Sequence, residues 1–170
     1  MYLTPFAAVF REQGQKKCRV ISTRGYPGLP DDEYALSEAY CSDPKCDCRR
    51  VMLNVTGRHR GDRYLASISF GFDRDAEMAD PFLDPLNRQS QYADALFRLV
   101  AQVLADPAYT ERLESHYRQF KHATADPQDP AYETIRRIWL DEKRWDGPPA
   151  RAVADAKKTV TTARKKRRKK

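Results

Sequence analysis

The sequence predicts an α+β fold, in which a small antiparallel sheet of three to four strands carries a metal-binding loop and packs on two to three helices. Three observations lead to this prediction. Apolar residues alternate in the first half of the chain, they recur every three to four residues in the second half, and three cysteines fall within the segment Cys41–Cys48. We expect one domain over residues 1–146, with a strand-rich metal-binding half at 1–75 and a helical half at 88–146, followed by a disordered basic tail at 147–170.

The expected strands are short stretches that are rich in β-branched residues and have a period of two. In residues 49–56, for example, Val51, Leu53 and Val55 share one face. Segments rich in turn-forming residues, such as Arg24–Gly28, end these stretches. We expect strands at residues 17–23, 34–41, 49–56 and 63–72, with the cysteines in the loop between the second and the third.

The expected helices combine apolar stripes with a repeated start. Stripes of 3.6-residue period run through residues 92–104, 109–120 and 132–139. The last two begin at Asp106 and Asp129, each of which precedes a proline, and an aspartate at this position can cap the free N–H groups of a helix. Between the two halves, residues 80–86 contain two Asp-Pro units. We expect a loop there whose apolar members pack the sheet onto the helices, with an ordinary linker as the alternative.

The clustered cysteines predict a zinc site. Zinc prefers four soft or borderline ligands in a tetrahedron. Cys46 and Cys48 form a Cys-x-Cys pair, which in extended backbone points both thiols to one side. The turn-forming pair Asp43-Pro44 lets the chain fold back, so that Cys41 can join them. We expect these three cysteines to be ligands, and the alternatives are unligated thiols or thiols in redox or catalytic use.

The fourth ligand is less constrained by the sequence. We expect Cys18, because a neighbouring strand could place it beside the cluster, and a small buried thiol is the alternative. His59 is a second candidate, for which a turn residue facing water is the plainer role. We expect His116 in the core, since it lies on an apolar stripe, and His122 at the surface. If no protein group closes the site, water would occupy the fourth position and the metal could be catalytic.

Three basic residues flank the cysteines. A zinc ion bound by three or four thiolates carries net negative charge. We expect Lys45, Arg49 and Arg50 to offset this charge and to donate hydrogen bonds to sulfur. Solubility of an exposed strand end is the alternative explanation.

The positive charge of the chain is concentrated at its end. The formal net charge is +7, and from Lys157 onward there are nine basic residues and no acidic one, so the rest of the chain carries about −2. We expect the final run to stay disordered until it meets RNA or DNA, whose phosphates it would contact without reading the bases. Ribosome adhesion, a nuclear localisation signal and a solubilising terminus are the alternatives. The run is Arg164, Lys165, Lys166, Arg167, Arg168, Lys169 and Lys170.

The sequence also indicates where the protein acts. Its N-terminus lacks the basic start of a signal peptide, and no stretch approaches the about 20 apolar residues of a membrane-spanning helix. We therefore expect a cytoplasmic protein with reduced thiols and no membrane partner.

Three segments carry a resemblance to known proteins. The string Tyr40–Val51, which contains Tyr-Cys-Ser-Asp-Pro-Lys-Cys-Asp-Cys-Arg-Arg-Val, resembles a cluster in a family of uncharacterised bacterial proteins, and Pro81–Asn87 and Asp106–Tyr109 are similar to the same family. The resemblance implies a shared architecture and a metal site at the three clustered cysteines, and it implies no activity. The Cys-x-Cys pair is distantly similar to SEC-C and SWIM metal-binding motifs. Their downstream Cys-Cys or Cys-x-His partner is missing here, so that assignment is not carried over.

Together these features predict a zinc-binding, non-enzymatic binding module whose polybasic tail contacts nucleic acid or another acidic partner. No catalytic residue is predicted, because the chain lacks a His-Glu-x-x-His motif, a phosphate-binding glycine loop and a nucleophile elbow. Two alternatives stay open. A zinc-dependent enzyme would use an open three-ligand site with a nearby base from among Glu38, Asp43, Asp47 and His59. A protein–protein adaptor would use exposed aromatic residues such as Tyr109, Tyr132 and Trp145.

Overall fold

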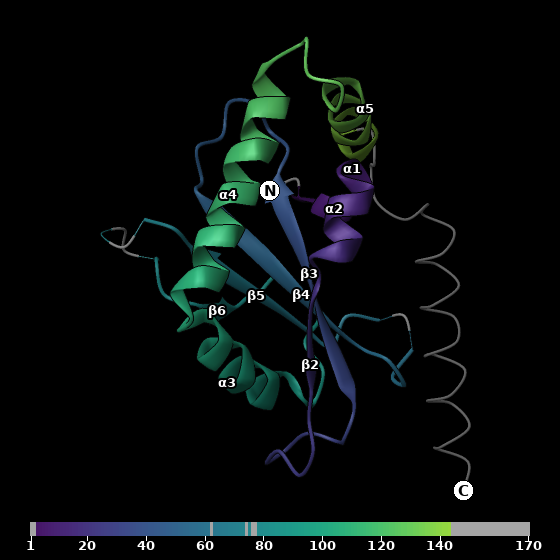
Figure 1. Cartoon of the computed structure of the whole chain (residues 1–170), viewed down its shortest axis with the longest axis vertical. Coiled ribbons are helices and arrows are strands. Elements are labelled where there is room, and N and C mark those ends of the chain that lie inside the picture. The colour runs from purple at the N-terminus through teal and green to yellow at the C-terminus, as the bar shows by residue number, and fades with distance from the viewer. Residues whose placement is uncertain (1–2, 62, 74, 76–77, 144–170) are drawn as a thin grey trace, which may run out of the picture. The chain divides into compact units, whose positions relative to one another are not determined.

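The computed structural model describes residues 3–61, 63–73, 75 and 78–143 (Figure 1). The chain divides into two compact units, Met1–Trp139 and Leu140–Lys170. The first unit contains the whole sheet and four complete helices. The predicted domain boundary at residue 146 and the predicted disordered tail at 147–170 lie outside the described residues and stay predictions.

Six antiparallel strands form one sheet, so the predicted α+β class is confirmed with more strands than expected. The strand β3 pairs with three others: β4 on one side, and β1 and β2 one after the other on the opposite side. Beyond β4 the order continues through β5 to β6. The strands are β1 (Leu3–Pro5), β2 (Arg19–Ser22), β3 (Glu33–Cys41), β4 (Arg50–Gly57), β5 (Ala66–Gly71) and β6 (Phe82–Leu83).

The four predicted strands correspond to β2–β5, and the sequence missed β1 and β6. These two strands have three and two residues, which is too short for an alternating pattern to be recognised. The segment 80–86, predicted as a loop, contains β6, whose Phe82 and Leu83 pair with Ser69 and Ile68 of β5. Leu83 packs against the core, whereas Leu86 is 88 % exposed and packs nothing onto the helices.

The described residues contain five helices: α1 (Phe6–Val9), α2 (Arg11–Lys16), α3 (Ala93–Leu104), α4 (Pro107–Ala125) and α5 (Tyr132–Lys143). The last three are the predicted ones. Asp106 caps α4 by accepting a hydrogen bond of 3.0 Å from the N–H of Ala108, and Asp129 accepts one of 2.8 Å from the N–H of Ala131 ahead of α5. The two additional helices, α1 and α2, are short and connect β1 to β2.

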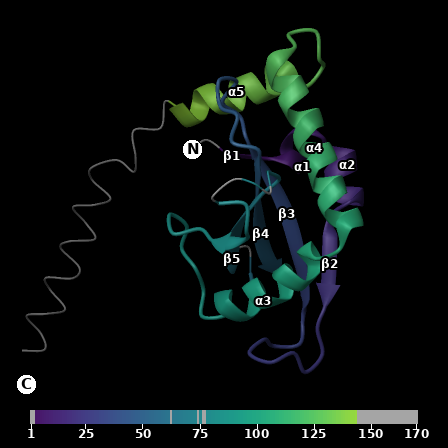
Figure 2. The ribbon, with the colours of Figure 1, turned by 90° about the vertical axis from the view of Figure 1, so that its left-hand side faces the viewer.

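Helices α3 and α4 cover one face of the sheet (Figures 1 and 2). The two-residue period of the strands directs their large apolar side chains toward these helices. The apolar faces of the helices, which repeat every 3.6 residues, are turned toward the sheet. The shared core contains many fully buried side chains, among them Leu36, Leu53, Ile68, Leu96, Leu113 and Phe120. No helix in the described part of the chain is both long and apolar enough to cross a membrane.

A polar contact is buried within this core. The carboxylate of Glu38 in β3 lies 2.7 Å from Nδ1 of His116 in α4, and it accepts a hydrogen bond of 2.9 Å from the hydroxyl of Tyr40. Both side chains of this contact are almost completely buried, and the imidazole stacks on Phe6 with ring centroids 4.4 Å apart. The prediction of a core position for His116 is therefore confirmed, and the contact fixes where α4 lies on β3.

We expect the substitution Glu38→Ala to lower the free energy of unfolding by about 3 kcal/mol, because it leaves the buried His116 ring without its acceptor. Glu38→Gln keeps an acceptor oxygen and should cost less. The matched control is Glu12→Ala, since Glu12 is 90 % exposed and should change stability by less than about 0.5 kcal/mol. Urea unfolding measures all three variants. Equal stabilities for the Ala variants at positions 38 and 12 would contradict a structural role for this contact.

Candidate metal centre

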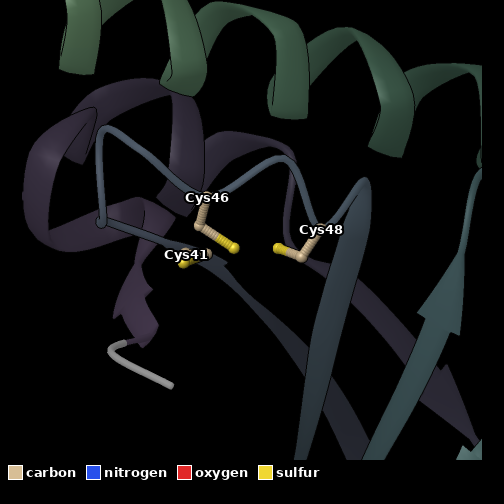
Figure 3. Close-up of side chains that lie close together, drawn as sticks. All are labelled: Cys41, Cys46 and Cys48. Atoms are coloured by element: carbon tan, nitrogen blue, oxygen red, sulfur yellow. The ribbon is translucent and has the colours of Figure 1, made fainter.

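The three clustered cysteines converge at one end of the sheet. Cys41 is the last residue of β3, and Cys46 and Cys48 lie in the loop that leads to β4 (Figure 3). Their sulfur atoms all lie within 4.8 Å of one another. Around a tetrahedral zinc ion with bonds of about 2.3 Å, the sulfurs would be about 3.8 Å apart. Small side-chain rotations would therefore suffice for these thiols to bind a metal ion.

Backbone hydrogen bonds shape the loop. The carbonyl of Asp43 accepts a bond of 3.1 Å from the N–H of Cys46, and its carboxylate accepts one of 2.9 Å from the N–H of Lys45. These bonds close the turn that Asp43-Pro44 predicted. After Cys48, Arg49 adopts a positive φ of 40°, which turns the chain sharply into β4. The loop thus presents its thiols inward between two turns.

Helix α4 passes over this loop, and two of its side chains form hydrogen bonds with it (Figure 3). The ammonium group of Lys121 donates hydrogen bonds to the carbonyls of Asp43, at 3.0 Å, and of Cys46, at 2.6 Å. One helical turn earlier, the hydroxyl of Tyr117 donates a bond of 3.3 Å to the carboxylate of Asp47. Two side chains of α4 therefore hold the backbone and one carboxylate of the loop.

The surroundings favour an ionised sulfur at Cys41. The thiol of Cys48 donates a hydrogen bond to Cys41, which lowers the pKa of Cys41, and the N–H of Asp43 and the charge of Lys121 act in the same direction against the opposing effect of burial. The same sulfur–sulfur contact raises the pKa of Cys48. The thiolate is the form that binds metals, so this lowered pKa favours metal binding at Cys41.

No family model, curated protein or solved structure matches this chain. No activity, ligand or partner is therefore transferred from a relative. The resemblance of residues 40–51 to a bacterial family stays a prediction, and the chemistry of the site rests on this chain's own residues.

Cys18 does not join the cluster. It lies just before β2, and its thiol is 3.5 Å from the carbonyl of Leu36 in the middle of β3. Leu36 precedes Cys41 by five residues, which corresponds to about 17 Å along a strand. The prediction of a neighbouring strand was right, but its register places Cys18 too far from the other thiols. Its half-buried position matches the alternative of a small buried thiol, and burial raises its pKa.

The histidines also lie away from the cluster. His59 follows the far end of β4 and contacts the carboxylate of Asp32 at 2.9 Å, with 73 % of its side chain exposed. His122 is exposed as predicted, and its ring nitrogen lies 3.6 Å from the carboxylate of Asp129. Among the described histidines, cysteines and acidic residues, the group that could hold a metal consists of Cys41, Cys46 and Cys48.

The basic neighbours form hydrogen bonds other than those predicted. Arg49 lies 3.5 Å from the carboxylate of Asp73, and Arg50 donates to the hydroxyl of Ser69 at 3.0 Å and to the carbonyl of Met78. Lys45 is exposed. Burial lowers the pKa of Arg50 and the nearby Cys48 sulfur acts in the opposite direction, so the predicted electrostatic contact of Arg50 with the cluster is present. The hydrogen bonds that hold the loop come instead from Lys121 and Tyr117. The only sequence signal for them was their four-residue spacing on one helix face, some 70 residues from the cysteines.

The acidic residues considered as bases near the metal are held in other contacts. Glu38 binds His116 and Tyr40 inside the core. Asp43 closes the loop turn, and the carboxylate of Asp47 accepts from Tyr117. These contacts suit carboxylates that shape the structure rather than carboxylates that take up a proton from substrate.

We expect Lys121→Gln to weaken metal binding about 10-fold or more, because the shorter neutral side chain loses the charge-assisted bonds that hold the loop carbonyls. Competition with a chromogenic chelator measures the affinity. The control is Arg118→Gln on the same helix, where 72 % of the side chain is exposed, and binding there should stay unchanged. Equal affinities for the two variants would show that α4 does not support the site.

Proposed function

We propose that this chain is a zinc-binding, non-enzymatic binding module with a polybasic tail that contacts nucleic acid or another acidic partner. The observation that carries the metal part is the approach of three sulfurs to within 4.8 Å of one another. Thiolates are soft ligands, and zinc is the common divalent ion that a set of cysteines in a structural site binds.

The surroundings support a structural role for the metal. The loop that carries the three thiols connects the end of β3 to the start of β4, so a bound ion would close this end of the hairpin. Structural zinc contributes its binding free energy to folding when the site does not exist in the unfolded chain. A metal ion that links the two strands would therefore add to the free energy of unfolding of this small sheet.

A zinc-dependent enzyme is the second candidate, and one observation favours it. The described part of the chain brings three protein ligands together, and catalytic zinc sites keep a fourth position for water or substrate. The engaged state of Asp47 and of the other nearby acids speaks against it. An adaptor built on exposed aromatics has less support, because Tyr109 is only 3 % exposed and Trp145 lies outside the described residues.

The nucleic-acid part of the proposal rests on charge. Seven consecutive basic residues end a chain whose remaining part is nearly neutral. Such a run gains affinity for polyanions by releasing their condensed counterions, and this gain falls steeply with salt concentration. Without interleaved aromatic or glycine residues, the tail would contact phosphates of any sequence.

We expect purified protein to contain one zinc ion per chain, and a strong chelator to lower its melting temperature. With free metal about 1,000-fold above the dissociation constant, the ion adds about 4 kcal/mol, which corresponds to about 8–16 °C for a chain of this size. Cys48→Ser should lose both metal and the chelator effect. Cys18→Ser is the matched control and should keep them.

The outcome also separates the two candidate roles. A melting curve unaffected by chelator, in protein that binds metal, would contradict the structural role and favour an open reactive site. Protein that binds no metal under reducing conditions would overturn the proposal itself.

We expect removal of residues 157–170 to remove most of the salt-sensitive RNA binding, because nine positive charges are lost. Fluorescence anisotropy with a labelled oligonucleotide at several salt concentrations measures this effect. The control keeps the length of the chain and replaces Thr159, Thr161 and Thr162 by alanine, which leaves the charge unchanged. Binding that persists with the same salt dependence would assign the contact to the folded part.

A further inference from the structure

An open hollow lies at the other end of the hairpin from the cysteines. It has a volume of about 740 Å³ and is lined by residues 60, 63–65 and 67 on one side and by residues 87–91 on the other. This volume is within the range of about 300–1,000 Å³ that is common for ligand sites. We call it the arginine hollow, after Arg60, Arg63 and Arg88, which line it together with Tyr64, Asn87 and Gln91.

The floor of the arginine hollow is fixed by backbone contacts to β5. The side chain of Gln89 accepts from the N–H of Ser67 at 3.1 Å and donates to its carbonyl at 3.2 Å, as a neighbouring strand would. The same amide donates to the carbonyl of Asp84 at 2.8 Å, and the N–H of Ser90 donates to the carbonyl of Leu65 at 3.0 Å. The two walls are therefore joined, and a ligand would meet a preformed surface.

The lining carries positive charge and an accessible aromatic ring. Arg60 is held by the buried carboxylate of Asp32, at 3.5 Å, and over the ring of Tyr92. Arg63 and Arg88 are exposed and have no ion pair within the described part of the chain. Tyr64 is 48 % exposed, one of few large hydrophobic side chains that face water in the described residues. None of the described lining residues is acidic.

We propose that the arginine hollow binds a short segment of single-stranded nucleic acid. Arg63 and Arg88 are exposed and suited to phosphate oxygens, and Tyr64 offers a face on which a base can stack. The amides of Asn87 and Gln91 add donors and acceptors for the edge of an unpaired base. An acidic peptide would use the arginines but would gain little from an aromatic face, and a base in a duplex has its faces already covered.

This inference rests on the proposed function for its class of partner, nucleic acid, but not for the metal or the tail. It locates a contact on the folded part that can recognise unpaired bases, which the tail cannot do. The two contacts can be separated, because neutral residues can replace the final basic run without touching the hollow.

The test uses the full-length chain with Arg164–Lys170 replaced by glutamine, and a labelled single-stranded oligonucleotide. We expect the double variant Arg63→Gln/Arg88→Gln to reduce the slope of log affinity against log salt by about 1.4, since each phosphate contact contributes about 0.7 for single strands. The control is Arg11→Gln/Arg118→Gln, which removes the same charge from exposed positions on α2 and α4 and should leave the slope unchanged.

Substitutions of Tyr64 distinguish stacking from charge. Tyr64→Leu should weaken binding about 5-fold or more, whereas Tyr64→Phe should bind as the parent does, because a phenyl ring still stacks. With the unmodified chain, an oligonucleotide carrying 4-thiouridine should cross-link on irradiation at Arg60, Arg63 or Tyr64, or within residues 87–91. Unchanged melting temperatures establish that the variants fold.

Three results would overturn this inference. One is a double variant whose salt slope equals that of its control. A second is equal binding by the leucine and phenylalanine variants of Tyr64. The third is that polyglutamate of equal charge displaces the labelled oligonucleotide as effectively as the unlabelled oligonucleotide does. This result would show that the hollow binds acidic polymers in general. If the hollow fails while loss of the tail still abolishes RNA binding, the proposed function survives without it.

Discussion

The rest of the structure depends on how α4 is seated on β3. That strand is hydrogen bonded to three others, and the contact of Glu38 with His116 fixes the helix on its core face. Because β3 ends at Cys41, the packing of the whole unit determines where the first thiol lies. The same helix holds the loop of the other two thiols through Lys121. The geometry of the metal centre is thus set by the interface between sheet and helix, and the loop follows from it.

The two proposed sites occupy opposite ends of one strand. The cysteine loop enters β4 at Arg50, and the first residues of the arginine hollow follow its end at Gly57, about 23 Å away for an extended strand. Each site has its own support, from α4 in one case and from the edge of β5 in the other. The proposed metal site and the proposed nucleic-acid contact could therefore be gained or lost separately, while the sheet keeps the two positions at a fixed spacing.

The sequence predicted those features whose signals are local. Period and caps located β2–β5 and α3–α5, and the spacing of the three clustered cysteines, together with Asp43-Pro44, predicted their convergence. The sequence-based predictions failed where the position of a side chain depends on the register between distant segments. Cys18 stands beside β3 as expected, but the pairing of Arg19 with Leu36 places it near the middle of that strand. The hydrogen bonds of Lys121 to the cysteine loop and the lining of the arginine hollow likewise depend on contacts between segments far apart in the sequence, which local patterns do not predict.

The borders of the sheet have a consequence for the behaviour of the protein at high concentration. A long, bare strand border can pair with another molecule and begin aggregation. Here β1 and β2 together cover one side of β3, and beyond β5 the last strand has only two residues, between Pro81 and Pro85. The amide of Gln89 then occupies the next main-chain groups of β5. The glutamine that shapes the hollow thus also shields this strand from fibril-like self-association.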